Sequence, residues 1–342
     1  MTPEQLQQIL EQNNPDACLK FFSQTTETER RALSETALAS MPIDGPYSSM
    51  FRESRSWQTR AIAVWASCSF DEVKQRGWLW LPEWNYVCAV LAARRPDWID
   101  EFADAILDFS TGWWGRVRRL VREGLCCEPK TDNYVIGMLG YFRYSPRRET
   151  RTLREELLAD PGLLDQEIWR LFEVEGAAGL SLATHDNQAQ PDRRWDQTLH
   201  ALSEEGRLSR RRLLDASLDA LARDFASYCA RWFSRFHDLL APTNEERIER
   251  AEKYLALLSN RNTATVSWAL KAVKRIENFR PLEGRKLIAA LRRLLHAPSK
   301  GTAMSALSLL DRLARRSSDL SSLVSLTMTE GLGHDDTDVQ AA

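Results

Sequence analysis

Apolar residues recur at helical spacing along most of the chain. From Trp57 they follow offsets of 4, 7, 8 and 11 residues, and similar stripes begin at Trp84 and Trp98. Two further stripes lie close together between residues 214 and 240. Stripes of this kind are typical of helices with one buried face. Alternation at period two is confined to a few residues, so the pattern predicts an all-α fold.

Several threonines and prolines carry helix-start signals. A threonine side chain can accept a hydrogen bond from the first turn of a helix, and proline fits the first turn but not the interior. The signals are Thr2 before Pro3, Thr26 with Glu29, Thr243 with Glu246, and the prolines Pro281 and Pro298.

One apolar pattern recurs near the C-terminal end at intervals of about 37 residues. The matched sets are Val266, Ala269, Leu270, Val273 and Ile276, then Ala303, Ala306, Leu307, Leu310 and Leu313, then Val339 and Ala342. Helix pairs at this period are typical of HEAT and armadillo repeats, which bury their apolar faces against neighbouring repeats. We predict a HEAT/armadillo-like α-solenoid of stacked antiparallel helix pairs, truncated at the C-terminus.

The pattern divides the chain into three parts. Residues 1–160 form an N-terminal helical block that is rich in tryptophan. Residues 161–205 form a junction with an irregular segment, where glycines and a polar cluster interrupt the periodicity. Residues 206–342 form HEAT-like repeats that end within a repeat. Because the third copy is incomplete, we expect a fragment or N-terminal part of a longer protein, with its last apolar face uncapped.

Composition places the chain among ordinary folded proteins. It has 342 residues, 43% of them hydrophobic and 27% charged, and a net charge of -2, which excludes the disordered class. The N-terminus lacks a signal-peptide pattern and no run of 18 apolar residues occurs, so we expect a cytoplasmic protein without a membrane partner. Six scattered cysteines without a C-x-x-C pair predict reduced thiols.

The most basic tract lies between residues 112 and 154. It holds ten lysines or arginines against four acids, a local balance of +6. Arginines that neutralise phosphates beside an aromatic ring that stacks on a base are typical of nucleic-acid binding. The candidate binding residues are Trp114, Arg116, Arg118, Arg119, Arg122, Arg147 and Arg148. The alternative is a solvated face whose arginines pair with acids such as Glu155 and Glu156.

Tryptophan is concentrated in the same half of the chain. Eight of the twelve tryptophans lie between Trp57 and Trp114, and we interpret most of them as core residues on the apolar stripes. Spacing places Trp113 on an inner face with Val117 and Leu120. Trp114 is then left beside that face, where a ring is free to bind.

No motif predicts catalysis. The five histidines are far apart and lack metal-ligand spacing, and no phosphate-binding or dinucleotide-binding glycine motif occurs, so we expect no metal and no cofactor. His185 and Asp186 lie in the glycine-flanked junction and are a candidate site. The simpler interpretation is that Asp186 caps a turn or helix.

The segment from about Trp169 to Ile276 resembles a known bacterial family. The residues that carry the resemblance are Trp169-Arg170-Leu171-Phe172, Glu175-Gly176, Gly206-Arg207-Leu208, Arg212-Leu213-Leu214-Asp215-Ala216-Ser217-Leu218, Arg223-Asp224-Phe225, Trp232-Phe233 and Leu240-Ala241-Pro242-Thr243. The chain is similar here to the domain-of-unknown-function family 6493, whose members are much longer. The resemblance implies a cytosolic helical-repeat protein and supplies no catalytic residue.

Two functional hypotheses follow. The first is a non-enzymatic scaffold that binds a protein partner or the missing C-terminal part of the same polypeptide. The second is a HEAT-like nucleic-acid-binding protein that uses the tract at 112–154. HEAT-like repeats also occur in alkylpurine DNA glycosylases, and that likeness is one of fold alone.

Overall fold

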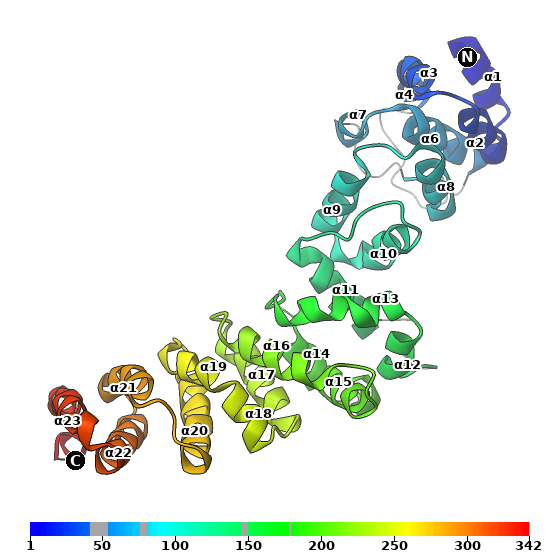
Figure 1. Cartoon of the computed structure of the whole chain (residues 1–342). Helices are drawn as coiled ribbons and strands as arrows, with labels where there is room; N and C mark the ends of the chain where they lie inside the picture. The colour runs from blue at the N-terminus through cyan, green and yellow to red at the C-terminus, as the bar shows by residue number, and fades with distance from the viewer. Residues whose placement is uncertain (42–53, 76–80, 145–149, 178, 342) are drawn as a thin grey trace. The chain divides into compact units, whose positions relative to one another are not determined.

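The computed structural model is helical, and the residues that it describes contain no strand (Figure 1). Those residues are 1–41, 54–75, 81–144, 150–177 and 179–341. The all-α prediction is confirmed. Backbone contacts divide the chain into two compact units, unit 1 from Met1 to Tyr141 and unit 2 from Phe142 to Ala342. The three-part division of the sequence stays a prediction.

Unit 1 is built around α6 (Arg55–Ser67), on which ten residues are buried. Helices α2, α4 and α8 pack against it. The other helices in the described part of unit 1 are α1 (Pro3–Glu11), α2 (Pro15–Ser23), α3 (Glu27–Ala32), α4 (Ser34–Ser40), α7 (Phe70–Gln75), α8 (Trp84–Arg94), α9 (Ile99–Phe109), the 3₁₀ turn η2 (Thr111–Trp113), α10 (Trp114–Arg122) and most of α11 (Asp132–Tyr144). Aromatic side chains pack between these helices, some edge to face, as Trp65 and Phe102 do at 4.9 Å between ring centres, and some stacked, as Phe70 and Trp98 are at 5.5 Å.

Unit 2 begins with short helices and continues as longer helices in pairs. The short elements are α12 (Leu153–Leu158), α13 (Pro161–Asp165), η3 (Glu167–Phe172), α14 (Leu182–Gln188), η4 (Pro191–Arg193) and α15 (Trp195–Glu204). The rest are α16 (Arg210–Leu221), α17 (Ser227–Leu239), α18 (Asn244–Glu249), α19 (Ala251–Ala256), η5 (Leu257–Ser259), α20 (Thr263–Phe279), α21 (Gly284–Arg292), η6 (Arg293–His296), α22 (Lys300–Arg316), η7 (Ser318–Leu320), α23 (Ser321–Met328), η8 (Thr329–Gly333) and α24 (Thr337–Ala341). None of the described helices has the length and apolar character that a bilayer-spanning segment needs.

The second helix of each pair recurs at a nearly constant interval. Helices α17, α20, α22 and α24 begin at Ser227, Thr263, Lys300 and Thr337, which are 36, 37 and 37 residues apart. The two complete sets of repeating apolar residues lie on α20 and α22, and all of their side chains are buried. Val339 on α24 is buried too. The periodicity read from the sequence is therefore the periodicity of the helices.

Polar contacts join residues at separations close to this interval, from 34 to 38 residues. The Nε of Arg250 donates to Asp215 at 3.0 Å, and the His334 ring nitrogen Nε2 lies 2.9 Å from the carbonyl oxygen of Ala297, 35 and 37 residues away. Similar pairs are Lys253–Asp219, Lys286–Glu252 and Arg292–Glu330. Exposed ion pairs of this kind contribute little energy each. They do link consecutive helix pairs, so they help to set the register between them.

The three threonine signals start helices as predicted. Thr2, Thr26 and Thr243 each accept a hydrogen bond from the third helical residue, whose side chain reaches back to the threonine N–H, at the starts of α1, α3 and α18. The chemistry of a cap is local, which is why the sequence predicts it well.

The two proline positions were predicted less well. Pro281 and Pro298 precede helices but do not lie in their first turns, since α21 begins at Gly284 and α22 at Lys300. Glu283 is the reason in the first case, because its carboxylate accepts the first free N–H groups of α21.

Candidate functional site

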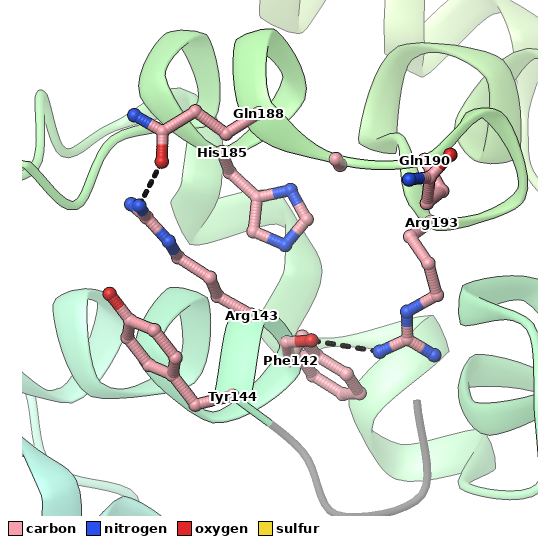
Figure 2. Close-up of a pocket in the computed structure, with 8 residues that line it drawn as sticks. Phe142, Arg143, Tyr144, His185, Gln188, Gln190 and Arg193 are labelled. Carbon is pink, nitrogen blue, oxygen red and sulfur yellow. Dashed lines mark hydrogen bonds between the residues drawn. The ribbon is translucent and has the colours of Figure 1, made fainter. Parts of the chain in front are cut away.

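One cavity of unit 2 collects aromatic, basic and amide side chains. It has a volume of about 410 Å³ and lies between the C-terminal end of α11 and the segment that contains α14 (Figure 2). Its lining residues are Phe142, Arg143, Tyr144, His185, Gln188, Ala189, Gln190 and Arg193. A concavity of this size with a few convergent polar groups is typical of a binding site.

A tight turn before α14 positions the histidine of this cavity. Gly176 has a φ of 100°, and a Cβ atom there would lie 2.3 Å from the carbonyl oxygen of Leu180, so only glycine fits. Ser181 then caps α14 by accepting a hydrogen bond from the Thr184 N–H at 3.1 Å. The turn and the cap together fix where α14 begins and which way His185 points.

The Asp186 side chain caps the start of the following long helix, α15. Its Oδ1 accepts from the Trp195 N–H at 2.7 Å, and its Oδ2 accepts from the Asp196 N–H at 2.9 Å and the Trp232 indole at 2.8 Å. Trp195 and Asp196 open α15, so the carboxylate satisfies two N–H groups that have no partner inside the helix. The capping role predicted for Asp186 is confirmed.

His185 has open hydrogen-bonding capacity. Its side chain is 3% exposed and points into the cavity, between Arg143 and Arg193 (Figure 2). Within the described part of the chain, neither ring nitrogen has a hydrogen-bond partner, although Nδ1 lies 3.4 Å from Asp186 Oδ1. A buried polar group without a partner is costly, so this ring is suited to a group that enters the cavity.

The two arginines of the cavity have different environments. Arg193 is buried and donates to Glu156 at 2.6 Å and to the Phe142 carbonyl oxygen at 2.8 Å, so it holds the cavity wall. Arg143 is half-buried and donates to Gly179 O at 2.5 Å and to Gln188. Because these two acceptors are neutral, they leave the positive charge of Arg143 available to an incoming acidic or polar group.

The inner face of α10 differs from the prediction by one residue. Trp114 is 3% exposed and lies on the buried face with Val117 and Leu120, whereas Trp113 is half-exposed. The physical reason is the 3₁₀ turn η2, which ends at Trp113 and changes the angular position of the residues before α10. The expectation that Trp114 lies beside the inner face was wrong.

Trp114 instead packs between α10 and α11. Its ring lies 5.8 Å from Tyr134 and 5.0 Å from Tyr141, centre to centre. Gly137 permits this approach, since a Cβ atom there would lie 2.8 Å from the Cβ of Trp114. Trp114 is thus a core residue of unit 1.

The predicted arginines are distributed over different environments. Arg118 is buried, and Arg119 pairs with Glu123 at 2.6 Å and also donates to Asn85. Arg122 lies on the exposed side of α10. Arg147 and Arg148 lie outside the described residues.

Arg116 is exposed and lies against two aromatic rings. Its guanidinium carbon lies 3.9 Å from the centre of the Trp113 ring and 5.8 Å from that of Trp84. Arg116 and Trp113 line an open cavity of about 550 Å³ with Ser110, Gly112, Gly115 and Tyr141. Of the acids named as alternative partners, Glu156 binds Arg193, and Glu155 completes the cap of α12 with Thr152.

Sequence reasoning missed most of the cavity in unit 2. The polar cluster around His185 was its one signal, since polar residues in a glycine-flanked segment are typical of loops with a function. Arg143 was counted only as part of a basic tract, and Arg193 was not singled out. Their partners are 36 to 51 residues away, a distance at which local patterns carry no information.

Comparison with known proteins identifies a family and no closer relative. The family model described as "Domain of unknown function (DUF6493)" matches residues 1–300. The chain belongs to the DUF6493 family. The match covers most of the chain, beyond the segment from Trp169 to Ile276 that carries the resemblance in the sequence. Searches of curated proteins and of solved structures gave no match to this DUF6493 protein.

The residues that carry the DUF6493 resemblance hold α16 to its neighbours. The guanidinium carbon of Arg212 lies 3.9 Å from the centre of the Trp169 ring. Leu240, another of these residues, accepts a hydrogen bond at its carbonyl oxygen from Arg210 of α16 at 2.6 Å. In this DUF6493 protein those residues therefore join the short helices at the start of unit 2 to its first helix pairs.

Proposed function

We propose that the chain is a helical-repeat scaffold that binds another protein. The observation that carries this proposal is the nearly constant interval of the paired helices in unit 2, 36 to 37 residues, with polar contacts between residues 35 and 37 positions apart. Helix pairs that contact each other at one repeat interval are the building principle of HEAT-like α-solenoids. Such solenoids act as extended binding surfaces.

The cavity between α11 and α14 is the proposed contact point for the partner. Tyr144, at its rim, is 63% exposed, and Arg143 and His185 face the space beside it. Tyrosine and arginine next to a pocket are the residue types that contribute most to protein–protein binding energy. A polar side chain of the partner would satisfy the ring nitrogens of His185.

Site-specific photo-crosslinking tests this proposal. We expect a photoreactive residue at Gln190, which is exposed and lines the cavity, to give a discrete crosslinked protein product in native-host cells. The same residue at Asn187, which is exposed on α14 but does not line the cavity, should give none. Equal products at both positions, or no product at Gln190, would contradict a partner at this cavity.

A second candidate function is nucleic-acid binding by unit 1. It is favoured by one observation, the exposed Arg116 guanidinium stacked on Trp113 beside an open cavity. Guanidinium and indole planes of this kind bind phosphates and unstacked bases in single strands.

Single-stranded oligonucleotide binding at several salt concentrations tests the second function. We expect Arg116→Ala to weaken binding about tenfold and to reduce the slope against log salt by about one. Trp113→Leu should weaken binding with an unchanged slope, because it removes stacking and no charge. Lys20→Ala, which removes an exposed charge elsewhere in unit 1, is the control. Absence of binding, or an equal effect of Lys20→Ala, would refute this function.

A further inference from the structure

A buried histidine interrupts the apolar face of the repeats. His237 on α17 lies at the position that Val273 occupies on α20 and Leu310 on α22, since successive positions differ by 36 and 37 residues. The side chains of Val273 and Leu310 are fully buried, and His237 is 1% exposed. A polar ring at a position that the fold fills with aliphatic side chains costs stability unless it is fully hydrogen-bonded.

The hydrogen bonds of His237 are complete and have a defined direction. Its Nδ1 lies 2.8 Å from Ser217 Oγ, and its Nε2 lies 2.6 Å from Tyr254 Oη. Ser217 also donates to the Leu214 carbonyl oxygen at 3.0 Å, so its oxygen accepts from Nδ1–H. Nε2 then accepts from the Tyr254 hydroxyl, and the neutral ring is held rigidly between α16 and α19.

This hydrogen-bonded chain reaches the wall of a positively charged cavity. The cavity has a volume of about 430 Å³, and its lining residues are His237, Asp238, Ala241, Arg247, Tyr254, Trp268, Lys271, Ala272 and Arg275. Among the described residues, the side chains of Arg247, Lys271 and Arg275 have neither an ion pair nor a hydrogen-bond partner. Asp238, the one acid of the lining, accepts from the Trp268 indole at 3.0 Å.

The charges of the lining therefore do not balance. Three cations face one carboxylate, and the histidine is neutral, which leaves an excess of two positive charges. Cations that converge on a concave surface raise the local concentration of anions. The rings of Tyr254 and Trp268, 5.8 Å apart, add an aromatic wall suited to a flat group.

From this geometry we propose that the cavity bounded by α17, α18, α19 and α20 binds a small phosphorylated ligand that carries a flat ring. The phosphate interacts with Arg247, Lys271 and Arg275, and the ring packs against Trp268. The His237 chain sets the position of Tyr254 and so of the aromatic wall. This site is separate from the cavity that contains His185 and does not depend on a protein partner.

Isothermal titration of the full chain with AMP, adenosine and inorganic pyrophosphate tests the proposal. We expect saturable binding of AMP and pyrophosphate and none of adenosine, because the phosphate supplies the charge that the cations attract. Trp268→Leu should weaken AMP binding and leave pyrophosphate binding unchanged. Lys271→Glu and Arg275→Glu should each weaken both by about tenfold or more.

Lys274→Glu is the matched control. Lys274 is on α20 next to Arg275 but does not line the cavity, so the same charge reversal should change the affinity by less than about twofold. A loss as large as that of Lys271→Glu would show diffuse electrostatic attraction and overturn the site, as would the absence of AMP binding. If a charge reversal unfolds the chain, Lys271→Gln and Arg275→Gln provide the same comparison.

Discussion

Replacing Asp186 by alanine should lower the free energy of unfolding of unit 2 by about 3–5 kcal/mol. The carboxylate is 4% exposed and accepts three hydrogen bonds, from the Trp195 and Asp196 N–H groups and from the Trp232 indole. Alanine removes the acceptor and leaves three donors with no acceptor, two of them at the start of α15. Urea unfolding of the full chain, followed by tryptophan fluorescence and circular dichroism, measures the change.

Asp192→Ala is the control for this measurement. Asp192 lies exposed on η4, six residues further along the chain, and its side chain makes no hydrogen bond among the described residues. Its replacement should change the free energy of unfolding by less than about 0.5 kcal/mol. If Asp186→Ala has as small an effect, the carboxylate does not hold α14, α15 and α17 together.

Local chemistry explains which parts of the fold were predictable from the sequence. Thr2, Thr26 and Thr243 cap helices through contacts within four residues, and the apolar sets on α20 and α22 follow helical geometry alone. Helix caps and apolar stripes are found in any all-α protein. The family resemblance supplied no functional residue. Two of the residues that carry it, Trp169 and Arg212, contact each other within unit 2.

An irregular turn and long-range contacts explain what was not predictable. Trp114 was placed beside the inner face of α10, and not on it, because a 3₁₀ turn precedes the helix and no residue type announces that turn. The cavity in unit 2 depends on the pair Arg193–Glu156, whose partners are 37 residues apart. Tertiary contacts of this kind decide which of many polar residues face a common space.

The repeat interval, once established, reveals sites that motif searches overlook. His237 is one of five histidines, and these lack the spacing of metal ligands. When the repeats are aligned, His237 occupies a position that is apolar in the other two repeats, where it is Val273 and Leu310. His237 is fully hydrogen-bonded to Ser217 and Tyr254, and it lines a cavity that Val273 and Leu310 do not line.

Stability should fall by about 2 kcal/mol between pH 7 and pH 5 through His237 alone. Burial among apolar side chains, helped by the positive charges of Arg247 and Arg250, lowers its pKa from 6.5 to about 3. As the pH falls through 6.5, the unfolded chain takes up a proton on this ring while the folded chain does not. Protonation therefore favours the unfolded state, and the loss continues until the pH reaches the folded pKa.

Urea unfolding of the wild type and of His237→Gln at both pH values isolates this contribution. Glutamine retains a donor and an acceptor but does not titrate, so the variant should lack the loss of about 2 kcal/mol whatever its own stability at pH 7. The His237 ring resonances of the folded wild type should also stay constant between pH 7 and pH 5. An equal loss in the variant, or a resonance that titrates near pH 6, would mean that the ring is charged in the folded protein. The hydrogen bonds assigned to Ser217 and Tyr254 would then have the opposite direction at one of the two nitrogens, because a charged imidazole donates from both.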